Sequence, residues 1–249
     1  MRHTLTDTER DWSVMAANDP MWAILTEHNK RGNRWNATEF FATGQRDVER
    51  MLARADALHL MPMRRDRALD FGCGLGRLTQ ALADTFARVD GVDIAAPMIA
   101  QAQQLHARDR RLTFHHNPAS DLTIFPDATF DLVFTYITLQ HNRRDAVVSY
   151  LSEFMRVLRA GGLALLHIPS RLRVDREVWE RAKLAIPRLY RWYRRRRFGS
   201  DATMETHTIP VPVVRAAVER AGGAVRHVDE PPPIGALPNE CWYYAHALR

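Results

Sequence analysis

A glycine-rich turn between a short apolar run and an amphipathic stretch constrains this chain more than any other feature. Residues 68–71 have the pattern of a buried strand, and residues 75–86 have the periodicity of a helix. Gly72, Gly74 and Gly76 stand at this junction in the spacing G-x-G-x-G. Glycines let the backbone approach a ligand where a side chain would clash, and a helix start offers free N–H groups to an anion. This order of strand, glycine turn and helix is the context that a nucleotide-binding loop requires.

An acidic residue, Asp93, ends the next predicted strand, residues 88–94. A carboxylate in that place accepts hydrogen bonds from both hydroxyls of a ribose. The glycine spacing differs from the G-x-G-x-x-G of dinucleotide-binding folds. Together these features predict a ligand that carries a nucleoside, and they leave both a nicotinamide dinucleotide and S-adenosylmethionine open.

Strands and helices alternate through most of the chain, which predicts an α/β fold. Alternation at this spacing favours a doubly wound, mostly parallel sheet with right-handed crossovers. Seven strands are expected, at residues 68–71, 88–94, 112–115, 130–136, 163–168, 224–229 and 241–248. Helices are expected at residues 75–86, 97–106, 145–158 and 211–221.

Two helical segments lie outside this alternation. Residues 1–60 form a predicted helical cover within the same domain, interrupted at Gly32–Asn33 and at Ala42–Gly44. Residues 61–249 form the α/β domain, with a basic and aromatic helical insert at about residues 171–200 after the fifth strand. The apolar content of 46% in 249 residues is enough for one such core.

Several segments in order resemble the class I S-adenosylmethionine-dependent methyltransferases, in particular those that act on small molecules. Leu69–Thr79 resembles their first motif, and Asp93 matches their second acidic position. Asn117–Leu122 and Phe130–Val133 resemble the stretch from the third strand into the fourth. Phe154–Gly162 resembles their R-V-L-(K/R)-P-G-G segment, with Ala160 in place of proline. The resemblance covers about residues 65–170 and implies the Rossmann-like methyltransferase fold.

The resemblance implies S-adenosylmethionine as the cofactor, with S-adenosylhomocysteine as the product. It implies that Asp70 steadies the loop and the methionine amino group, and that Asp93 holds the ribose. Either Asp121 or Asn117 is the implied partner of the adenine amino group, because the register there departs by about a residue from the common Gly-Asp-Ala pattern. The implied cofactor residues are Asp70, Gly72, Cys73, Gly74, Arg77, Asp93, Ile94, Met98, Asn117, Asp121, Leu122, Tyr136 and Gln140.

Methyl transfer needs alignment of two reactants, and a hydroxyl acceptor also needs a base. His141 follows the fourth strand at the carboxyl edge of the sheet and is the predicted base or acceptor-orienting group, with a loop-structuring role as the alternative. Tyr136 is expected near the sulfonium, or else as a packing residue. His167, His207 and Glu240 are weaker candidates.

No metal is expected. No cysteine or histidine cluster has metal-ligand spacing, and His115 and His116 are adjacent on a strand and so face opposite sides. The fifth strand also lacks the Asp-Asn pair of magnesium-dependent catechol-type enzymes. The fourth strand lacks the (Asp/Asn)-Pro-Pro-(Tyr/Phe) pattern of enzymes that methylate nucleic acid bases.

The formal net charge is +6, and 33 of the 35 basic residues are arginine. Most of them are interpreted as solvated helix faces, although Arg188–Arg197 with its aromatic residues predicts weak contact with an anionic surface. We expect a cytoplasmic protein, because two cysteines make no disulfide framework. No transmembrane segment is expected, because no apolar run reaches the ~20 residues of a membrane span. The expected assembly is a monomer or a homodimer.

The expected acceptor is a small or medium molecule, anionic or linked to a glycan or lipid, methylated on oxygen or nitrogen. RNA or protein methylation is the alternative within the enzyme class, although nucleic acid is not the favoured partner. A regulator or assembly factor that binds S-adenosylmethionine without turnover is the alternative of another class.

Overall fold

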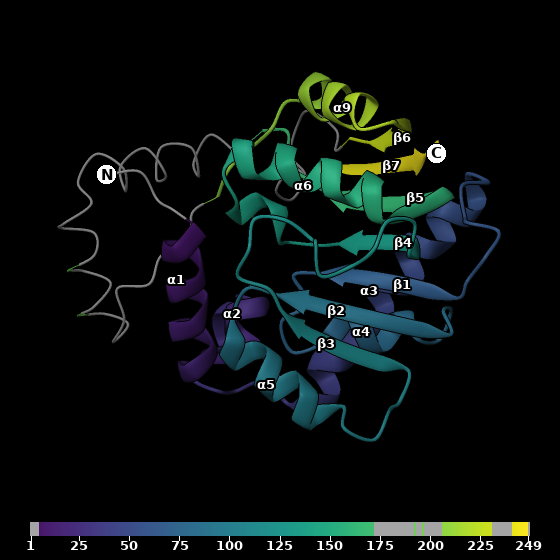
Figure 1. Cartoon of the computed structure of the whole chain (residues 1–249). Helices are drawn as coiled ribbons and strands as arrows, with labels where there is room; N and C mark the ends of the chain where they lie inside the picture. The colour runs from purple at the N-terminus through teal and green to yellow at the C-terminus, as the bar shows by residue number, and fades with distance from the viewer. Residues whose placement is uncertain (1–4, 172–191, 193–195, 197–205, 231–240, 249) are drawn as a thin grey trace.

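A seven-stranded sheet runs through the computed structural model, which describes residues 5–171, 192, 196, 206–230 and 241–248 (Figure 1). Within these residues the strand order is β3-β2-β1-β4-β5-β7-β6. Of the described strands, β7 alone runs opposite to the rest, so the predicted doubly wound, mostly parallel α/β fold is confirmed. The strands are β1 (Arg67–Phe71), β2 (Arg88–Asp93), β3 (Leu112–His116), β4 (Phe130–Thr135), β5 (Leu158–His167), β6 (Gly223–Asp229) and β7 (Trp242–Ala247).

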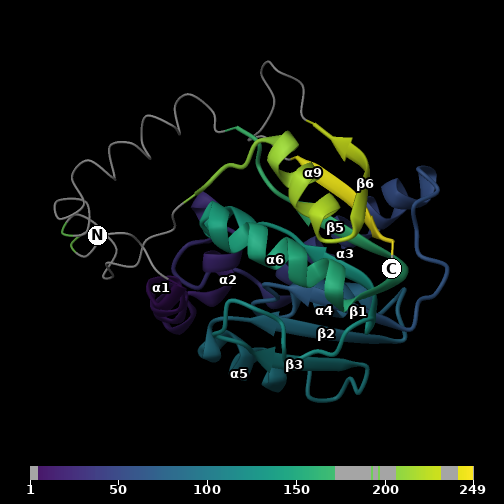
Figure 2. The ribbon, with the colours of Figure 1, turned by 45° about the horizontal axis from the view of Figure 1, so that its top comes forward.

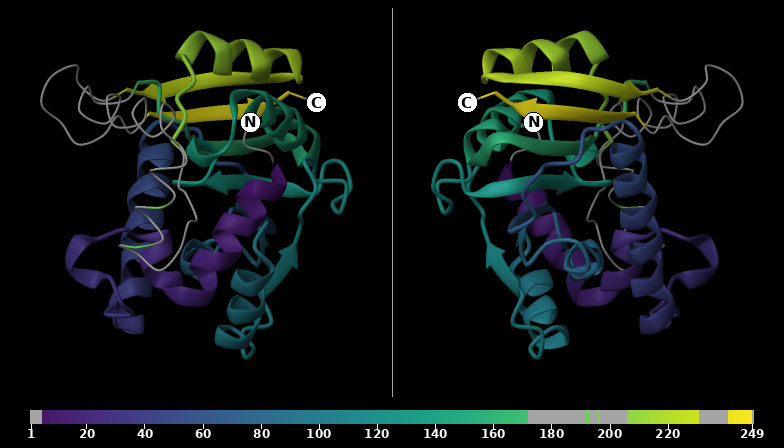
Figure 3. Two further views of the ribbon diagram at one scale, coloured as in Figure 1. Left: turned by 90° about the vertical axis from the view of Figure 1, so that its left-hand side faces the viewer. Right: turned by 90° about the vertical axis from the view of Figure 1, so that its right-hand side faces the viewer.

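Helices cover both faces of the sheet, as the edge-on views show (Figure 3). One face packs on α3 and α4, and the other packs on α6 and α9, which lie across the sheet in Figure 2. Strand β4 is buried along its whole length because it is central and covered on both sides. The described helices are α1 (Leu5–Asn18), α2 (Pro20–Ile24), η1 (His28–Lys30), α3 (Ala37–Ala57), α4 (Arg77–Leu82), α5 (Ala96–Leu105), η2 (Leu139–His141), α6 (Arg144–Val157) and α9 (Val211–Arg220).

The N-terminal helices α1 and α2 lie beside the carboxyl ends of the parallel strands (Figure 1). Their buried side chains, which include Met15 and Ala23, form a cluster with Leu75 of the glycine loop and Met98 of α5. This packing places the cover directly over the glycine loop. The cover and the sheet therefore enclose the edge where ligands bind in α/β folds.

Helix α3 is continuous through Ala42–Gly44, where the sequence predicts an interruption. Gly44 is buried and faces α4, and a Cβ atom at this position would lie 2.2 Å from the carbonyl oxygen of Arg77. The glycine lets two helices approach closely and does not end a helix. The expected break at Gly32–Asn33 does occur, between η1 and α3, and both residues have positive φ.

Two other elements differ in length from the prediction. The helix expected at residues 75–86 begins at Arg77, because Gly76 has a left-handed conformation at its N-cap, and it ends at Leu82. Strand β5 begins at Leu158 and not at residue 163, because residues 158–162 continue the strand through an irregularity opposite Phe130 and Leu132.

The predicted basic insert at about residues 171–200 falls outside the described residues, apart from Arg171, Trp192 and Arg196. Arg188–Arg197 is covered only at those last two positions, so its surface contact stays a prediction. In the described parts of the chain, no helix is long and apolar enough to cross a membrane.

Candidate active site

The glycine loop follows β1 and is tied to the end of β2 by backbone hydrogen bonds. The amides of Gly72 and Cys73 donate to the carbonyl oxygen of Val92 at 2.8 and 3.1 Å. Gly72, Gly74 and Gly76 have φ values of +79°, +53° and +81°, which favour glycine. A Cβ atom on Gly72 would lie 2.1 Å from the Thr138 side chain, and one on Gly74 would lie 2.6 Å from Ile24. The loop therefore leaves no room for side chains at these two positions.

Asp93 connects this loop to the start of α5. One carboxylate oxygen accepts from the amide of Gly74 at 2.9 Å, and the other accepts from the amide of Ala95 at 2.8 Å. Burial raises the pKa of this carboxyl group, and the backbone hydrogen bonds oppose the shift. Each carboxylate oxygen has a further lone pair, so Asp93 can also accept hydrogen bonds from ligand hydroxyls.

A cavity of about 920 Å³, partly open to solvent, lies between the cover and the carboxyl edge of the sheet. Ten of the sequence-predicted site residues line it: Gly72, Cys73, Gly74, Arg77, Asp93, Ile94, Met98, Asn117, Tyr136 and His141. The structure thus brings most of the predicted set together around one space.

Four predicted residues lie outside the cavity wall: Asp70, Asp121, Leu122 and Gln140. Asp70 is fully buried beneath the loop and accepts a hydrogen bond from the Thr79 hydroxyl at 2.7 Å. Burial raises the pKa of Asp70 to about 7. The Gln140 side-chain nitrogen lies 3.1 Å from Nε2 of His141, so Gln140 contacts a residue of the cavity wall without lining the cavity itself.

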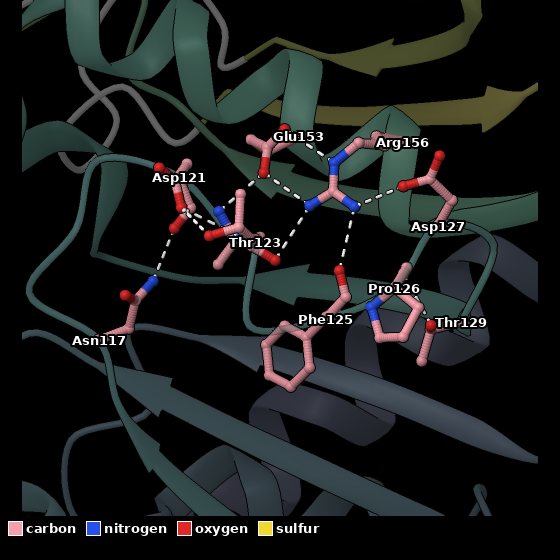
Figure 4. Close-up of polar contacts among 10 residues, drawn as sticks. Asn117, Asp121, Thr123, Phe125, Pro126, Asp127, Thr129, Glu153 and Arg156 are labelled. Carbon is pink, nitrogen blue, oxygen red and sulfur yellow. Dashed lines mark hydrogen bonds and ion pairs between the residues drawn. The ribbon is translucent and has the colours of Figure 1, made fainter.

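Arg156 holds the segment between β3 and β4 against α6 (Figure 4). Its guanidinium donates to the carbonyl oxygens of Leu122 and Phe125, each at 3.0 Å, and forms ion pairs with Asp127 and Glu153. Glu153 also accepts from the amide of Leu122 at 2.7 Å. Arg156 therefore fixes the backbone of the loop that contains Asp121 and Leu122, although neither side chain faces the cavity.

Asn117 starts the same loop and connects it to the cavity. Its side-chain amide donates to the carbonyl oxygen of Asp121 at 2.6 Å and its oxygen accepts from the amide of Ala119. Of the two candidate adenine partners, Asn117 lies in the cavity wall and Asp121 does not. Asp121 instead accepts hydrogen bonds from the backbone and hydroxyl of Thr123.

His141 ends the short helix η2 and lies under the cover. The edge of Trp12 from α1 contacts its ring with centroids 5.2 Å apart. The amide of His141 donates to the carbonyl oxygen of Thr138 at 3.0 Å. The His141 ring is thus held in the cavity wall between η2 and α1, and Tyr136 lines the same cavity.

Of the weaker candidates, His167 is buried at the end of β5, and His207 donates its backbone amide to the carbonyl oxygen of Gln140 at 2.7 Å. Glu240 lies outside the described residues. His115 bonds to Asp90 and His116 to the carbonyl oxygen of Ile94. No group of three or more histidine, cysteine or acidic side chains in the described ranges could hold a metal ion.

Several residues of the cavity wall belong to no motif that the sequence shows. Thr138 and Asn142 come from the turn after β4, and Tyr150 comes from α6. Ile137, also in the wall, has a φ of +58°, which few side chains adopt. The sequence pointed to this turn only through its position after a central strand. Its side chains follow no recognisable motif.

Residues 68–162 match a family described as a methyltransferase domain. A malonyl-[acyl-carrier protein] O-methyltransferase of Salmonella typhimurium is 37% identical over 115 residues, which are 44% of this chain and 42% of that protein. A demethylmenaquinone methyltransferase of Clavibacter sepedonicus is 35% identical over 103 residues, or 41% of this chain and 40% of that protein. This chain thus aligns with about two fifths of the length of these curated relatives.

The fold also matches solved structures over nearly the whole chain. Magnesium protoporphyrin IX methyltransferase from Synechocystis, with bound S-adenosylhomocysteine, has a TM-score of 0.63 and 16% identity, covering 97% of this chain and 99% of that chain. The glycine loop, Asp93 and strands β2, β3 and β4 lie in the region that matches the methyltransferase domain. Residues 68–162 therefore match a methyltransferase-domain family, and the chain shares the fold of a solved methyltransferase.

Proposed function

We propose that this chain binds S-adenosylmethionine in the cavity under α1 and α2 and transfers its methyl group to a small or medium acceptor. The observation that carries this proposal is the joint placement of the glycine loop and Asp93 in one cavity wall. A loop without Cβ atoms at Gly72 and Gly74 and a carboxylate beside it suit a nucleoside with a charged amino-acid end.

The wall offers a partner for each part of this cofactor. Asp93 would accept from the ribose hydroxyls, while Ile94 and Met98 supply apolar contact for the base. Asn117 offers polar atoms at the edge of the same space, and the backbone of Gly72 and Gly74 would approach the amino-acid end. When bound, the cofactor would supply a methyl group on a sulfonium sulfur, and the neutral thioether left behind needs no protonation to leave.

The protein's own contribution is alignment of the reactants, exclusion of water and acceptance of a proton. The cover contributes Trp12 and Ile24 to the cavity wall, and these apolar side chains would limit the access of water to the reactants. His141 would accept the proton of a hydroxyl acceptor or orient it, since its ring lies in the wall near Tyr136. None of these roles requires a metal ion.

The direct test is transfer of a radioactive methyl group from labelled S-adenosylmethionine to a cell extract separated into small-molecule, RNA and protein fractions. We expect label in the small-molecule fraction, and less label when His141 is replaced by alanine. Label in RNA or protein would favour the alternative acceptors. Binding of S-adenosylhomocysteine without label in any fraction would favour a regulator that binds the cofactor without turnover.

A further inference from the structure

A strained backbone position lies in the wall of the cavity, at Ile137, whose φ is +58°. The left-handed conformation brings Cβ close to the following carbonyl oxygen, and a branched Cβ increases the crowding. The other described non-glycine residues with positive φ are Asn33, His59 and Ala128. Asparagine and histidine are enriched in this conformation, and alanine has the smallest side chain. Among the described residues, Ile137 is therefore the one whose positive φ costs most.

The backbone on both sides of Ile137 is fixed, and this imposes the turn. Thr135 belongs to β4, in register with β5, and Leu139 is buried in the core. Between them, the carbonyl oxygen of Thr138 accepts a hydrogen bond from the amide of His141 at 3.0 Å. The chain must therefore turn within three residues. The turn does not call for a branched side chain, because glycine adopts a positive φ without strain.

The Ile137 side chain does not pack in the core. It is partly exposed, and it belongs to none of the apolar clusters that the described residues form. It lines the cavity instead, together with its neighbours Tyr136 and Thr138. Consecutive side chains of a strand point to opposite faces, so only a turn brings three of them to one cavity. Strained residues of this kind cluster at ligand-binding sites, where the surrounding structure holds them.

The turn at Tyr136–Thr138 borders the glycine loop. A Cβ atom on Gly72 would lie 2.1 Å from the Thr138 side chain, so the two backbones are in close contact there. Three residues further along, His141 lies in the same cavity wall. If the amino-acid end of the cofactor rests on the glycine loop and His141 faces the acceptor, the sulfur lies between them, beside Ile137.

We propose that Ile137 is a specificity-determining residue whose side chain contacts the cofactor at its sulfur and the adjoining methylene groups. The apolar side chain would favour a thioether chain and keep water away from the sulfur. The backbone strain persists because this contact requires a branched side chain where folding alone would favour glycine. The inference rests on the proposed function and adds to it a residue that no motif of the sequence indicates.

Three variants at this position separate strain from contact. Ile137→Ala and Ile137→Gly both remove the branched side chain, but only glycine removes the strain. In urea unfolding without ligand, we expect Ile137→Gly to be more stable than Ile137→Ala, the reverse of their order at an ordinary backbone position. Ile137→Val keeps the branch and should unfold near the wild-type urea concentration. A glycine variant less stable than the alanine variant would overturn the inference, because the position would then not be strained.

Titration calorimetry with S-adenosylhomocysteine measures the contact. Ile137→Gly and Ile137→Ala should each bind about tenfold more weakly than the wild type. Ile137→Val loses one methylene group and should bind no more than about fourfold more weakly. The glycine variant would thus gain stability over the alanine variant while losing affinity relative to the wild type, which a purely structural residue would not show. Wild-type affinity in the glycine variant would overturn the inference.

Adenosine is the matched ligand control, because it ends before the sulfur. Its affinity should be the same for the wild type and Ile137→Gly, and an equal loss for both ligands would overturn the assignment to the sulfur. Ala128→Gly is the matched protein control, since it relieves a positive φ at an exposed position outside the cavity wall. It should not lower stability and should leave the affinity for S-adenosylhomocysteine unchanged.

Binding of S-adenosylhomocysteine to the wild type, measured first, distinguishes this inference from the proposed function. If the wild type does not bind it, the proposed function fails. If the wild type binds it and Ile137→Gly binds it equally well, only the assignment of Ile137 fails.

Discussion

Asp93 is the side chain on which cofactor binding depends most directly, because it contacts the loop and faces the cavity. Asp93→Ala removes the acceptor for the amides of Gly74 and Ala95 as well as the expected acceptor for the ribose. We expect the free energy of S-adenosylhomocysteine binding to weaken by roughly 1–3 kcal/mol. Titration calorimetry measures it, with unfolding in urea as a check on the fold. Unchanged affinity would exclude Asp93 from the cofactor site.

Asp70 makes the stability of the protein depend on pH. Its pKa of about 7 in the folded protein exceeds the ordinary value of 3.8, so the folded state binds a proton that the unfolded chain releases between these values. The contribution of Asp70 to the free energy of unfolding therefore falls as pH rises from about 4 to about 7.

Asp70→Asn removes this titration and keeps the size of the side chain. Relative to the wild type, the variant should become more stable as pH rises, as measured by urea unfolding at about pH 5 and about pH 8. A stability difference that is the same at both pH values would contradict the assignment. A difference that grows in the opposite direction would also contradict it.

The contact between α3 and α4 depends on the absence of a side chain at Gly44. Glycine to alanine in an exposed helix stabilises by about 1 kcal/mol. Here the added Cβ would lie 2.2 Å from the carbonyl oxygen of Arg77, so the two helices must separate. We expect Gly44→Ala to lower the free energy of unfolding by about 1–3 kcal/mol. Thr38→Ala, at an exposed position of the same helix, is the control and should not destabilise.

Helix α6 and the segment between β3 and β4 are joined by Arg156. Arg156→Ala leaves the carbonyl oxygens of Leu122 and Phe125 without this donor and Glu153 without its ion pair. We expect a loss of about 1–3 kcal/mol in the free energy of unfolding. Arg143→Ala, which breaks an exposed ion pair with Asp145, should change it by no more than about 0.5 kcal/mol. Equal effects of the two variants would show that Arg156 does not clamp the loop.

The strands and helices that flank the cavity could be predicted because their apolar periodicity is local. The order of motifs also predicted that the glycine loop and Asp93 would meet at one sheet edge. The continuity of α3 at Gly44 could not be predicted from the sequence. A glycine that ends a helix and a glycine inside a helix look alike there, and they differ only in the residues that pack against them. Tyr150 was missed for the same reason, because the packing of α6 brings it to the cavity.

The cofactor cavity forms where the sheet and the N-terminal cover pack against each other. The sheet presents the glycine loop, Asp93 and Tyr136 at its carboxyl edge, and the N-terminal cover closes the space above them (Figure 1). The cover contributes Thr8, Trp12 and Ile24 to the wall. No single element contains the site, which depends on the sheet order and on the packing of the cover.

The most direct test of this account is titration calorimetry of the wild-type chain with S-adenosylmethionine, S-adenosylhomocysteine and NAD in parallel. The protein is first freed of any co-purified ligand by unfolding and refolding. The account predicts dissociation constants in the micromolar range for both sulfur ligands and no heat of binding for NAD. Binding of NAD, or the absence of binding by either sulfur ligand to refolded protein, would contradict the assignment of this cavity as a methyl-donor site.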